Sequence, residues 1–509
     1  MARHRCFIHG GLSLMTAACF NPTGQTDSDS TSVGSTVTSG PMTSTATSSA
    51  ETTTTSTTSA TSATSATSEA TTAGTSESTT AGTTGAPASC SEALIPDDYC
   101  AAIDPQAAIC DVEAGQCVQC VATEDCGGEG VCDVDARVCV ECVGDADCAL
   151  EAAPACDLGT QSCGCTEHEQ CPDTACAIDL GLCFPKEQTA VVYSRASEDP
   201  SCSDFLACSV FEPCCSIAAA LAKGAAMGKS HVVIRVAPGE GGLADPGLAL
   251  NDQAIGKSVA ILGEDAPLVE RSSGAPVIYV NVAATKAYIA GLRLRAGDGA
   301  PGAGVSCIGA AAWLDDVIVE ALPSGTAFFA SVCAMRLRRS AGRGVKRGIW
   351  ASQGGSVTAV NTTVASVSEF AVRAEGGGSV ALVFSTITER TGAPGRLLSC
   401  VGAGSTISAR NSALLAGPEV GSNACVPATA SDSVVTDPLL AARSVVVVQD
   451  IQVPSLFVNW MGDDLHVKPG AAPLSEVAVR AAGDPTTDLD REPRPLAIGA
   501  LDWAGADRP

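Results

Sequence analysis

Short apolar segments recur along the C-terminal three-fifths of the chain, and Gly-rich turns separate them. Runs such as HVVIRV, SVAILG and AYIAGLRL have the β-branched and aliphatic composition of buried strands. SVTAVNTTV at Ser356 and SVALVFSTI at Ser379 are clear internal matches. Aligning one turn residue of each unit gives Gly291, Asp316, Arg336, Asn361, Phe384 and Asn411, with spacings of 20 to 27 residues. The apolar positions show no helical spacing, so an all-β region is expected.

This irregular period predicts a parallel β-solenoid over residues 190–509. Each coil of such a fold adds one strand layer of about 4.8 Å, and about twelve or thirteen coils fit the length of the region.

The two ends of this region resemble the right-handed parallel β-helix, or pectin-lyase-like, superfamily. The C-terminal end is similar to the closing pattern of bacterial surface β-helix proteins of the choice-of-anchor type, although Arg491 replaces a common Gly and Leu474 replaces an Ala. The matching residues are Asp464, Leu465, His466, Pro473, Asp488, Asp490, Arg494, Pro495, Ile498, Gly499 and Ala500. The resemblance implies a β-helix at a bacterial surface. It also implies a capping helix over Ser216–Ala226, which would cover the unpaired strand edges of the first coil. It implies no single activity, because one fold hosts many functions.

The cysteines of the solenoid region test the coil period. Cys307 and Cys333 are 26 residues apart, and Cys400 and Cys425 are 25 apart, so each gap equals one coil. Residues one coil apart stack at a distance that a disulfide can bridge. We therefore expect the bridges Cys307–Cys333 and Cys400–Cys425. The remaining four cysteines, Cys202, Cys208, Cys214 and Cys215, are expected to pair among themselves near the N-terminal cap.

Residues 90–189 form a cysteine-rich region that contains the motif C-x2-C at Cys117 and Cys120 and again at Cys139 and Cys142. Taken alone, this spacing is typical of a four-thiolate zinc site. However, the sixteen cysteines fall into four groups of four, and each C-x2-C spans a joint between two groups. At the third joint, Cys163-Gly164-Cys165, the C-x2-C spacing is lost while the repeat continues. The pattern therefore predicts four tandem modules with two disulfides each, and it leaves their connectivity open.

An aspartate follows the third cysteine in three of the four modules: Asp111, Asp133 and Asp157. This position favours an Asx turn in the six-residue loop before the fourth cysteine. The region is strongly acidic, with 21 Asp and Glu against Arg137 and Lys186. Acidic residues that converge on one point bind calcium, so calcium is the one cofactor that the composition suggests. No EF-hand spacing is present, and a solvated acidic surface is the simpler interpretation.

The N-terminus has the features of an export signal. A basic start and a short apolar stretch end at Cys19, which resembles the lipid-attachment cysteine of a bacterial lipoprotein signal over residues 1–19. An ordinary secretory signal or a misassigned start codon are the alternatives. Residues 20–89 are dominated by Ser, Thr, Ala and Gly and predict a disordered linker, because they offer too little apolar surface to form a core.

Charge and hydropathy limit the classes of partner. The chain of 509 residues has a formal net charge of −27 and 26 cysteines. An acidic protein is repelled by phosphate backbones, so nucleic-acid binding is not expected. No apolar run of 18 or more residues follows the N-terminus. Contact with a membrane is therefore expected only through the lipid on Cys19.

No motif identifies a catalytic site. The candidate acids are Asp298, Asp315, Asp316 and Glu320, and the nearby bases are Lys286, Arg293 and Arg295. Adjacent residues on a strand face opposite sides, so Asp315 and Asp316 converge only if they lie at a turn. His231 and His466 are expected to be structural. We therefore assign no catalytic residue and no metal ligand.

One basic run stands out in this acidic chain. It contains Arg336, Arg338, Arg339, Arg343, Lys346 and Arg347. Its candidate ligands are an anionic polysaccharide, lipid A phosphates and the acidic repeats of the same chain. A solvated loop is the alternative.

Together these features predict a cell-surface or secreted lipoprotein, at the outer membrane, whose β-helix presents a binding face for adhesion or for a polysaccharide. A polysaccharide lyase or glycoside hydrolase on the same fold is the second hypothesis, and a structural spacer is the third. Carboxylates that meet on adjacent coils would favour the enzyme. An aromatic-lined groove would favour glycan binding.

Overall fold

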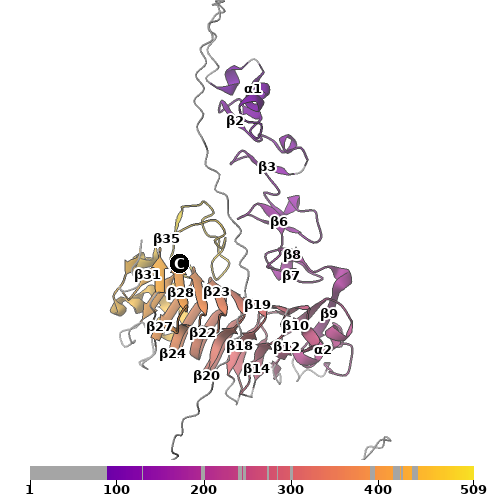
Figure 1. Ribbon diagram of the computed structural model, residues 1–509, viewed down its shortest axis with the longest axis vertical. Helices are drawn as coiled ribbons and strands as arrows, with labels where there is room; N and C mark the ends of the chain where they lie inside the picture. The colour runs from indigo at the N-terminus through magenta and orange to yellow at the C-terminus, as the bar shows by residue number, and fades with distance from the viewer. Residues whose placement is uncertain are drawn as a thin grey trace, which may run out of the picture. The chain divides into compact units, whose positions relative to one another are not determined.

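The computed structural model describes residues 89–509 apart from 94, 129, 196–200, 239–242, 245–247, 251, 272–273, 284, 298–301, 390–395, 417–424, 426–427 and 438–444. The predicted signal peptide, Cys19 and nearly all of the predicted linker lie outside these residues. Two regions follow along the chain: four small disulfide modules and a β-solenoid with a long C-terminal segment (Figure 1). Among the described residues, we find no helix with the length and apolarity needed to cross a membrane.

Each disulfide module contains one short antiparallel hairpin. The third and fourth cysteines of the module lie directly opposite each other on its two strands. The hairpins are β1 (Ile109–Asp111) with β2 (Gln116–Val118), β3 (Val131–Asp133) with β4 (Val138–Val140), β5 (Ala155–Asp157) with β6 (Ser162–Gly164), and β7 (Cys176–Ala177) with β8 (Leu182–Cys183). The short helices of this region are η1 (Cys90–Glu92), α1 (Pro96–Ile103), η2 (Thr123–Cys126), η3 (Asp145–Asp147), η4 (His168–Gln170) and η5 (Lys186–Gln188).

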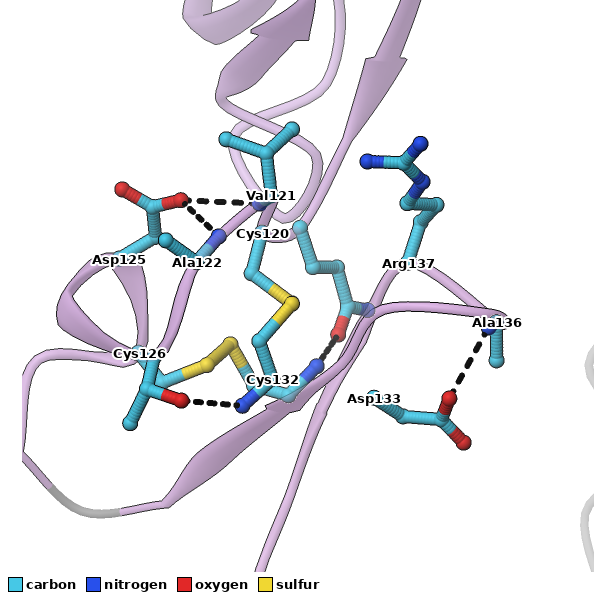
Figure 2. Close-up of a disulfide and its surroundings, with 12 residues drawn as sticks. Cys120, Val121, Ala122, Asp125, Cys126, Cys132, Asp133, Ala136 and Arg137 are labelled. Atoms are coloured by element: carbon cyan, nitrogen blue, oxygen red, sulfur yellow. Dashed lines mark hydrogen bonds between the residues drawn. A yellow bond between two sulfur atoms is a disulfide. The ribbon is translucent and has the colours of Figure 1, made fainter. Parts of the chain in front are cut away.

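The disulfides settle the grouping of the cysteines. In every module the first cysteine pairs with the third and the second with the fourth. Examples are Cys120–Cys132 (Figure 2) and Cys126–Cys139. The other three modules repeat this connectivity: Cys90–Cys110 and Cys100–Cys117, Cys142–Cys156 and Cys148–Cys163, Cys165–Cys176 and Cys171–Cys183. Cys117 and Cys120 thus belong to different modules. The zinc interpretation of this C-x2-C is therefore wrong, because both sulfurs are in disulfides.

Acidic side chains organise the backbone of the modules. Asp133 Oδ1 accepts the backbone N–H groups of Asp135 and Ala136, both at 3.1 Å, and Asp111 accepts those of Glu113 and Ala114. These bonds confirm the predicted Asx turns. Asp125 has a second role, since its Oδ2 accepts the N–H groups of Val121 and Ala122 at 2.8 and 2.9 Å (Figure 2). Part of the acidic surface therefore closes turns and module joints.

The solenoid is built from two long parallel sheets. The first consists of β9 (Thr189–Ser194), β10 (His231–Val236), β13 (Ser258–Gly263), β16 (Lys286–Ala290), β19 (Ala311–Asp315), β21 (Ala334–Arg338), β23 (Ser356–Val360), β25 (Ser379–Val383), β28 (Thr406–Arg410) and β30 (Ala428–Ser431). The second consists of β11 (Leu243–Ala244), β12 (Leu248–Leu250), β14 (Leu268–Arg271), β15 (Ile278–Val280), β17 (Arg293–Ala296), β18 (Ala303–Ile308), β20 (Ile318–Ser331), β22 (Ala341–Ser352), β24 (Thr363–Glu375), β26 (Thr386–Glu389), β27 (Arg396–Val401), β29 (Ala413–Ala416), β31 (Val434–Val435) and β32 (Val446–Val447).

These strands form a parallel β-solenoid of about seven turns over residues 231–435. The predicted solenoid class is therefore confirmed. The estimate of twelve or thirteen coils is wrong, because the residues after β32 leave the solenoid and pack on its side. Small and branched aliphatic residues fill the interior at equivalent positions of successive coils, as with Ile234, Ile261 and Ile289.

A column of left-handed residues turns the chain from the first sheet into the second. It comprises Gly291, Asp316, Arg339, Asn361, Phe384, Asn411 and Asp432, with φ between 47° and 64°. The spacing of the repeats places Arg336 in this column. That assignment is wrong, since Arg336 lies in the middle of β21 and the turn comes three residues later. Asn, Asp and Gly adopt this conformation readily, whereas Arg339 and Phe384 need surrounding contacts to hold it.

A buried hydroxyl ladder follows this column. The residue after each of the last five turn residues is Ser340, Thr362, Ser385, Ser412 or Ser433, and all five are fully buried. The hydroxyl of one coil accepts the backbone N–H of the previous coil, as from Ser385 to Ser412 Oγ at 3.1 Å and from Ser412 to Ser433 Oγ at 3.0 Å. The ladder thus satisfies backbone donors that the tight turns would leave unpaired.

Helix α2 (Ile217–Ala226) covers the first coil, as predicted. Ser216 is its N-cap and accepts the backbone N–H of Ala219 at 3.1 Å. The disulfides Cys202–Cys215 and Cys208–Cys214 lie just before this helix. Farther along the solenoid, the structure joins Cys307 to Cys333 and Cys400 to Cys425. These are the pairs that the coil spacing predicts.

The C-terminal segment packs back on the solenoid (Figure 1). Its elements are η8 (Asp450–Leu456), β33 (Phe457–Asn459), η9 (Trp460–Gly462), β34 (Asp464–Val467), η10 (Ala472–Leu474), β35 (Ala478–Val479) and β36 (Leu501–Asp502). Arg494 anchors the segment. Its buried guanidinium pairs with Asp502 at 2.9 Å and lies 4.3 Å from the centre of the Phe384 ring. This contact accounts for a phenylalanine at a left-handed turn position.

Candidate functional site

The predicted basic run does not form a loop. Arg336 and Arg338 lie on β21 of the first sheet, Arg339 lies at the turn, and Arg343, Lys346 and Arg347 lie on β22 of the second sheet. The turn sends the two halves of the run to different faces of the solenoid. The alternative of a solvated loop is therefore wrong, and each half of the run has its own surroundings.

The first half contacts the fourth disulfide module. Arg338 holds Asp315 with two hydrogen bonds, at 2.5 and 3.0 Å, and donates to the backbone oxygen of Thr166 at 2.6 Å. Arg339, which is only 3% exposed, pairs with Glu167 at 2.6 Å and with Asp315 at 2.7 Å. Thr166 and Glu167 belong to the acidic repeats, so these two arginines bind the repeat region of their own chain.

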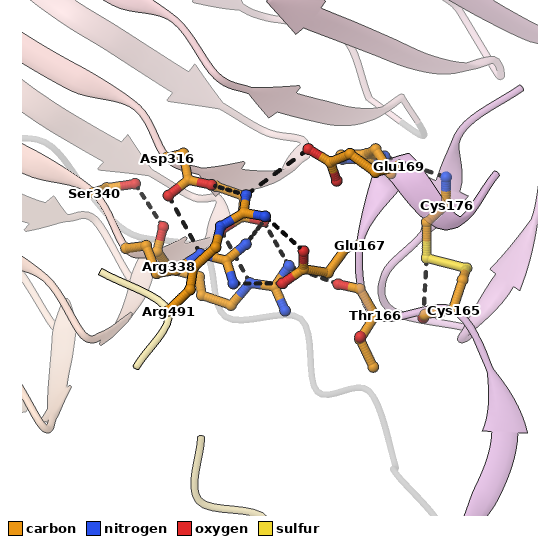
Figure 3. Close-up of polar contacts among 12 residues, drawn as sticks. Cys165, Thr166, Glu167, Glu169, Cys176, Asp316, Arg338, Ser340 and Arg491 are labelled. Carbon is orange, nitrogen blue, oxygen red and sulfur yellow. Dashed lines mark hydrogen bonds and ion pairs between the residues drawn. A yellow bond between two sulfur atoms is a disulfide. The ribbon is translucent and has the colours of Figure 1, made fainter. Parts of the chain in front are cut away.

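The C-terminal segment joins the same network through Arg491 (Figure 3). Arg491 donates to Glu167 at 3.0 Å and to Asp316 at 2.7 Å. Glu167 therefore links the solenoid and the C-terminal segment to the fourth module. We call this group of Glu167, Asp315, Asp316, Arg338, Arg339 and Arg491 the junction network.

The protonation of the junction network follows from its geometry. Burial alone would raise the pKa of Asp315, but the charges of Arg338 and Arg339 outweigh burial and hold that pKa below its usual value. Burial raises the pKa of Asp316, and the adjacent Asp315 charge adds to the effect. Two of the candidate catalytic acids are thus components of a structural ion-pair network.

Other contacts fix the fourth module on the first sheet. Asp179 accepts from Lys286 at 2.6 Å and from the Tyr288 hydroxyl at 2.5 Å. Arg235 donates to the backbone oxygen of Pro172 at 2.5 Å. Phe184 stacks on His231 with ring centres 4.5 Å apart. The module therefore shares a small core with the solenoid, in addition to its ion pairs.

The second half of the basic run lies beside aromatic rings that are partly or fully buried. Register pairs align Tyr279, Ser306, Phe329, Trp350 and Arg373 across five consecutive strands of the second sheet. Arg347 aligns with Phe370 in the neighbouring column. We call the set of Tyr279, Phe329, Arg347, Trp350, Phe370 and Arg373 the aromatic–arginine face.

Aromatic and cationic groups alternate on this face. The Trp350 ring lies 4.9 Å from the Phe329 ring and 5.9 Å from the Phe370 ring, both edge-on. The guanidinium carbon of Arg347 is 5.2 Å from the centre of Trp350, and that of Arg373 is 5.5 Å away. Each such cation–π contact contributes about 0.5–2 kcal/mol. Glu369 accepts from Arg347 Nε at 2.9 Å and so orients that guanidinium.

A shallow hollow of ≈ 320 Å³ opens on this face. Its lining includes Tyr279, Thr326, Phe329, Arg347 and Trp350. Trp350 Nε1 and Arg373 Nε are buried and have no hydrogen-bond partner among the described residues. A buried donor without an acceptor costs about 1–3 kcal/mol. This surface thus combines partly exposed rings, cations and unused donors.

The remaining candidate residues have structural partners. Glu320 pairs with Arg293 at 2.5 Å and with Arg343 at 3.1 Å, and Arg295 pairs with Glu270. Asp298 lies outside the described residues. A second hollow of ≈ 400 Å³ is lined by Asp316, Asp464, His466 and Asp490, among others. His466 lies between Asp464 and Asp490, with 2.8 Å to Asp490 Oδ2.

Sequence reasoning missed Phe329, Trp350, Phe370 and Arg373. A signal was present, because Phe329, Trp350 and Arg373 follow one another at one-coil spacing and therefore stack. The interpretation of the basic run uses only the density of positive charge. An alignment of the residues by the coil period would have placed Arg347 beside the aromatic rings and apart from Arg338.

Comparison with known proteins gives one match. Residues 121–189 match the model of a protein family of unknown function (DUF8331). This range begins just after Cys120, the first cysteine of the second disulfide module, includes the third and fourth modules and ends where β9 begins. No curated protein and no solved structure matches the chain. The many disulfides indicate a secreted or extracellular protein.

Proposed function

We propose that the protein is an exported, non-enzymatic surface protein whose solenoid binds an acidic glycan along the aromatic–arginine face. The observation that carries this proposal is the edge-on pair of Phe329 and Trp350 at one-coil spacing, flanked by Arg347 and Arg373. Aromatic rings pack on the apolar faces of sugar rings, and guanidinium groups recognise carboxylates or sulfates. The strand layers repeat at about 4.8 Å, which is close to the length of one sugar ring.

The rest of the chain fits a display role. The N-terminal segment supplies a lipid-type signal ending at Cys19 and a long polar linker, which would tether the solenoid to the outer membrane. The closing pattern around Arg494 resembles that of right-handed, pectin-lyase-like surface proteins of the choice-of-anchor type, and this resemblance supports a surface location. Compact disulfide modules between linker and solenoid resist the proteases of an extracellular setting.

The second hypothesis, a lyase or hydrolase, has less support on this face. No carboxylate pair lines the hollow beside Trp350 within the described range, and Glu369, which contacts the lining residue Arg347, is held by Arg347 and Lys346. Burial alone would raise the pKa of Glu369, but Arg347 and Lys346 outweigh burial and hold that pKa below its usual value. The carboxylate therefore stays ionised. Hydrolysis would require one of two carboxyl groups to be protonated.

The test is a binding titration with glycan oligomers that carry carboxylates or sulfates, and with neutral oligomers of equal length. Arg347→Ser combined with Arg373→Ser should weaken binding of the acidic oligomers at least tenfold and should lower its salt dependence. Arg295→Ser is the matched control, since it removes one arginine of the same sheet away from the aromatic rings. Equal affinity of the double variant and the wild type would sink the proposal.

The same samples are incubated for days and assayed for new reducing ends and unsaturated sugars. Release of product would replace the binding role with the enzymatic one. Absence of binding to every oligomer, with a folded protein, would leave the spacer role as the better description.

A further inference from the structure

Another cavity lies where the first sheet of the solenoid meets the fourth disulfide module. This junction groove has a volume of ≈ 440 Å³. Its floor includes Trp313 and Arg336, and its walls include Asp157 and Glu167 of the modules and Asp484 of the C-terminal segment. Three segments that are distant in the sequence thus enclose one cavity, of a size that suits a small molecule.

Arg336 is the unpaired cation of the groove. It is exposed, and it has no ion pair or hydrogen bond among the described residues, whereas Arg338 and Arg339 are fully engaged in the junction network. The carboxylate of Asp484 is occupied by Arg410 at 2.9 Å. The groove therefore presents one unused guanidinium beside the ion pairs of Asp315, Glu167 and Asp484.

Trp313 lies on the next strand, directly beside Arg336 in the sheet register. One face of its ring stacks on Tyr288, with centres 4.9 Å apart and planes at 16°. The side chain is only partly buried, yet its Nε1 is buried and has no acceptor among the described residues. An indole N–H without an acceptor costs free energy, which a ligand oxygen would recover.

Asp157 supplies an acceptor on the opposite wall. Its Oδ1 accepts the backbone N–H of Gly159 at 2.9 Å, and no cation pairs with it in the described part of the chain. These three groups match a sugar ring that carries hydroxyl groups and one anionic group. The cation would bind the anionic group, the aromatic ring would pack on the sugar ring, and the carboxylate would accept from a hydroxyl group.

We propose that the junction groove binds a single sugar unit bearing one anionic group, with Arg336 as its anchor and Trp313 as its stacking platform. The site is separate from the aromatic–arginine face and does not depend on it. The fourth module builds one wall, so the disulfide repeat takes part in ligand binding as well as in linking the solenoid to the N-terminal region.

The two sites are distinguished by their tryptophans. Titrations follow intrinsic fluorescence in Trp350→Phe protein, which keeps Trp313, and in Trp313→Phe protein, which keeps Trp350. The probes are a hexuronate, a hexose 6-phosphate, a hexose 6-sulfate and the neutral hexose. We expect at least one anionic probe to change the fluorescence of the Trp350→Phe protein with saturation, and the neutral hexose to bind at least tenfold more weakly.

Arg336→Ser in the Trp350→Phe background should reduce the affinity at least tenfold. Arg373→Ser, on the aromatic–arginine face, should leave it unchanged. Arg336 is exposed and unpaired among the described residues, so its replacement is not expected to affect folding, which the thermal midpoint checks. Unchanged affinity after Arg336→Ser, or no saturable response to any anionic probe, would overturn the proposal. Neither result depends on whether longer glycans bind at Trp350.

Discussion

Arg339 and Glu167 are 172 residues apart in the sequence, and Arg339 Nη1 donates to Glu167 Oε1 at 2.6 Å. This contact joins a turn of the solenoid to the last disulfide module. Arg339 also occupies a left-handed backbone position, so its side chain and its backbone are both constrained by the same junction. The boundary between repeat region and solenoid is thus a packed interface.

Replacing Arg339 with Met should loosen this interface. Asp315, which is buried, then loses one of its two cations. The ion pair between the solenoid and Glu167 is lost as well. Breaking a buried ion pair in this way costs about 3–5 kcal/mol. Hydrogen exchange should become faster in β7 and β8, and the thermal midpoint should fall. The control is Arg396→Ser, because Arg396 is an exposed arginine on β27. If hydrogen exchange in β7 and β8 stays slow in both variants, the role given to Arg339 is contradicted.

The fourth module should be sensitive to acid through His168. Burial lowers the pKa of this imidazole from 6.5 to about 4, and its Nδ1 accepts the backbone N–H of Cys176. The unfolded chain therefore binds a proton between pH 6.5 and pH 4 that the folded protein does not. Stability from this group is complete above pH 6.5 and falls as the pH drops to 4, by about 3 kcal/mol in total.

His168→Asn tests this dependence, because the Asn oxygen keeps an acceptor near Cys176 and does not titrate. Urea unfolding of both proteins at pH 7, 5.5 and 4 gives the free energies of unfolding. The difference between wild type and variant should move in favour of the variant as the pH falls. A difference that is the same at all three pH values would rule out a buried neutral imidazole.

The bridge between Cys307 and Cys333 should stabilise the middle of the solenoid. It closes a loop with a sequence separation of 26 residues, for which the loss of chain entropy in the unfolded state gives about 3–4 kcal/mol. The double variant Cys307→Ala and Cys333→Ala should lower the denaturant midpoint accordingly. A reduced wild-type sample serves as the comparison. If the double variant has the same midpoint as the oxidised wild type, the result counts against the estimate.

The hydroxyl ladder should show its effect in Ser385→Ala. This change removes the acceptor for the backbone N–H of Thr362 in the core and leaves that donor unpaired. The expected loss is about 1–3 kcal/mol in the free energy of unfolding. Ser385→Thr, which keeps the hydroxyl and matches Thr362 of the previous coil, should retain most of the stability. Equal losses in both variants would indicate that packing, and not the hydrogen bond, decides this position.

Local chemistry made much of the fold predictable. The gap of six residues between the last two cysteines of each group, the N-cap at Ser216 and the turn residues Asn361 and Asn411 all depend on neighbours in the sequence. The prediction failed at Arg336, where the turn residue is Arg339. The serine or threonine after each turn would have corrected this, because Ser340, Thr362 and Ser385 are spaced 22 and 23 residues apart.

The candidate sites were less accessible to sequence reasoning. Arg338 and Arg347 belong to one basic run, yet one contacts Thr166 and the other lies over Trp350. Their separation depends on a backbone turn at Arg339 that the charge pattern does not encode. The junction groove requires Asp157, Arg336 and Asp484 to meet, and only tertiary packing brings them together.

The self-contained pairing of the four modules has a consequence for oxidative maturation. Four cysteines can form two bonds in three ways, so each module faces three choices, whereas sixteen cysteines that pair freely face an enormous number. An early mispairing stays within one module and can be rearranged there without disturbing its neighbours. The region can therefore mature one module at a time as the chain emerges, and gain or loss of one module would leave the rest able to reach their native bonds.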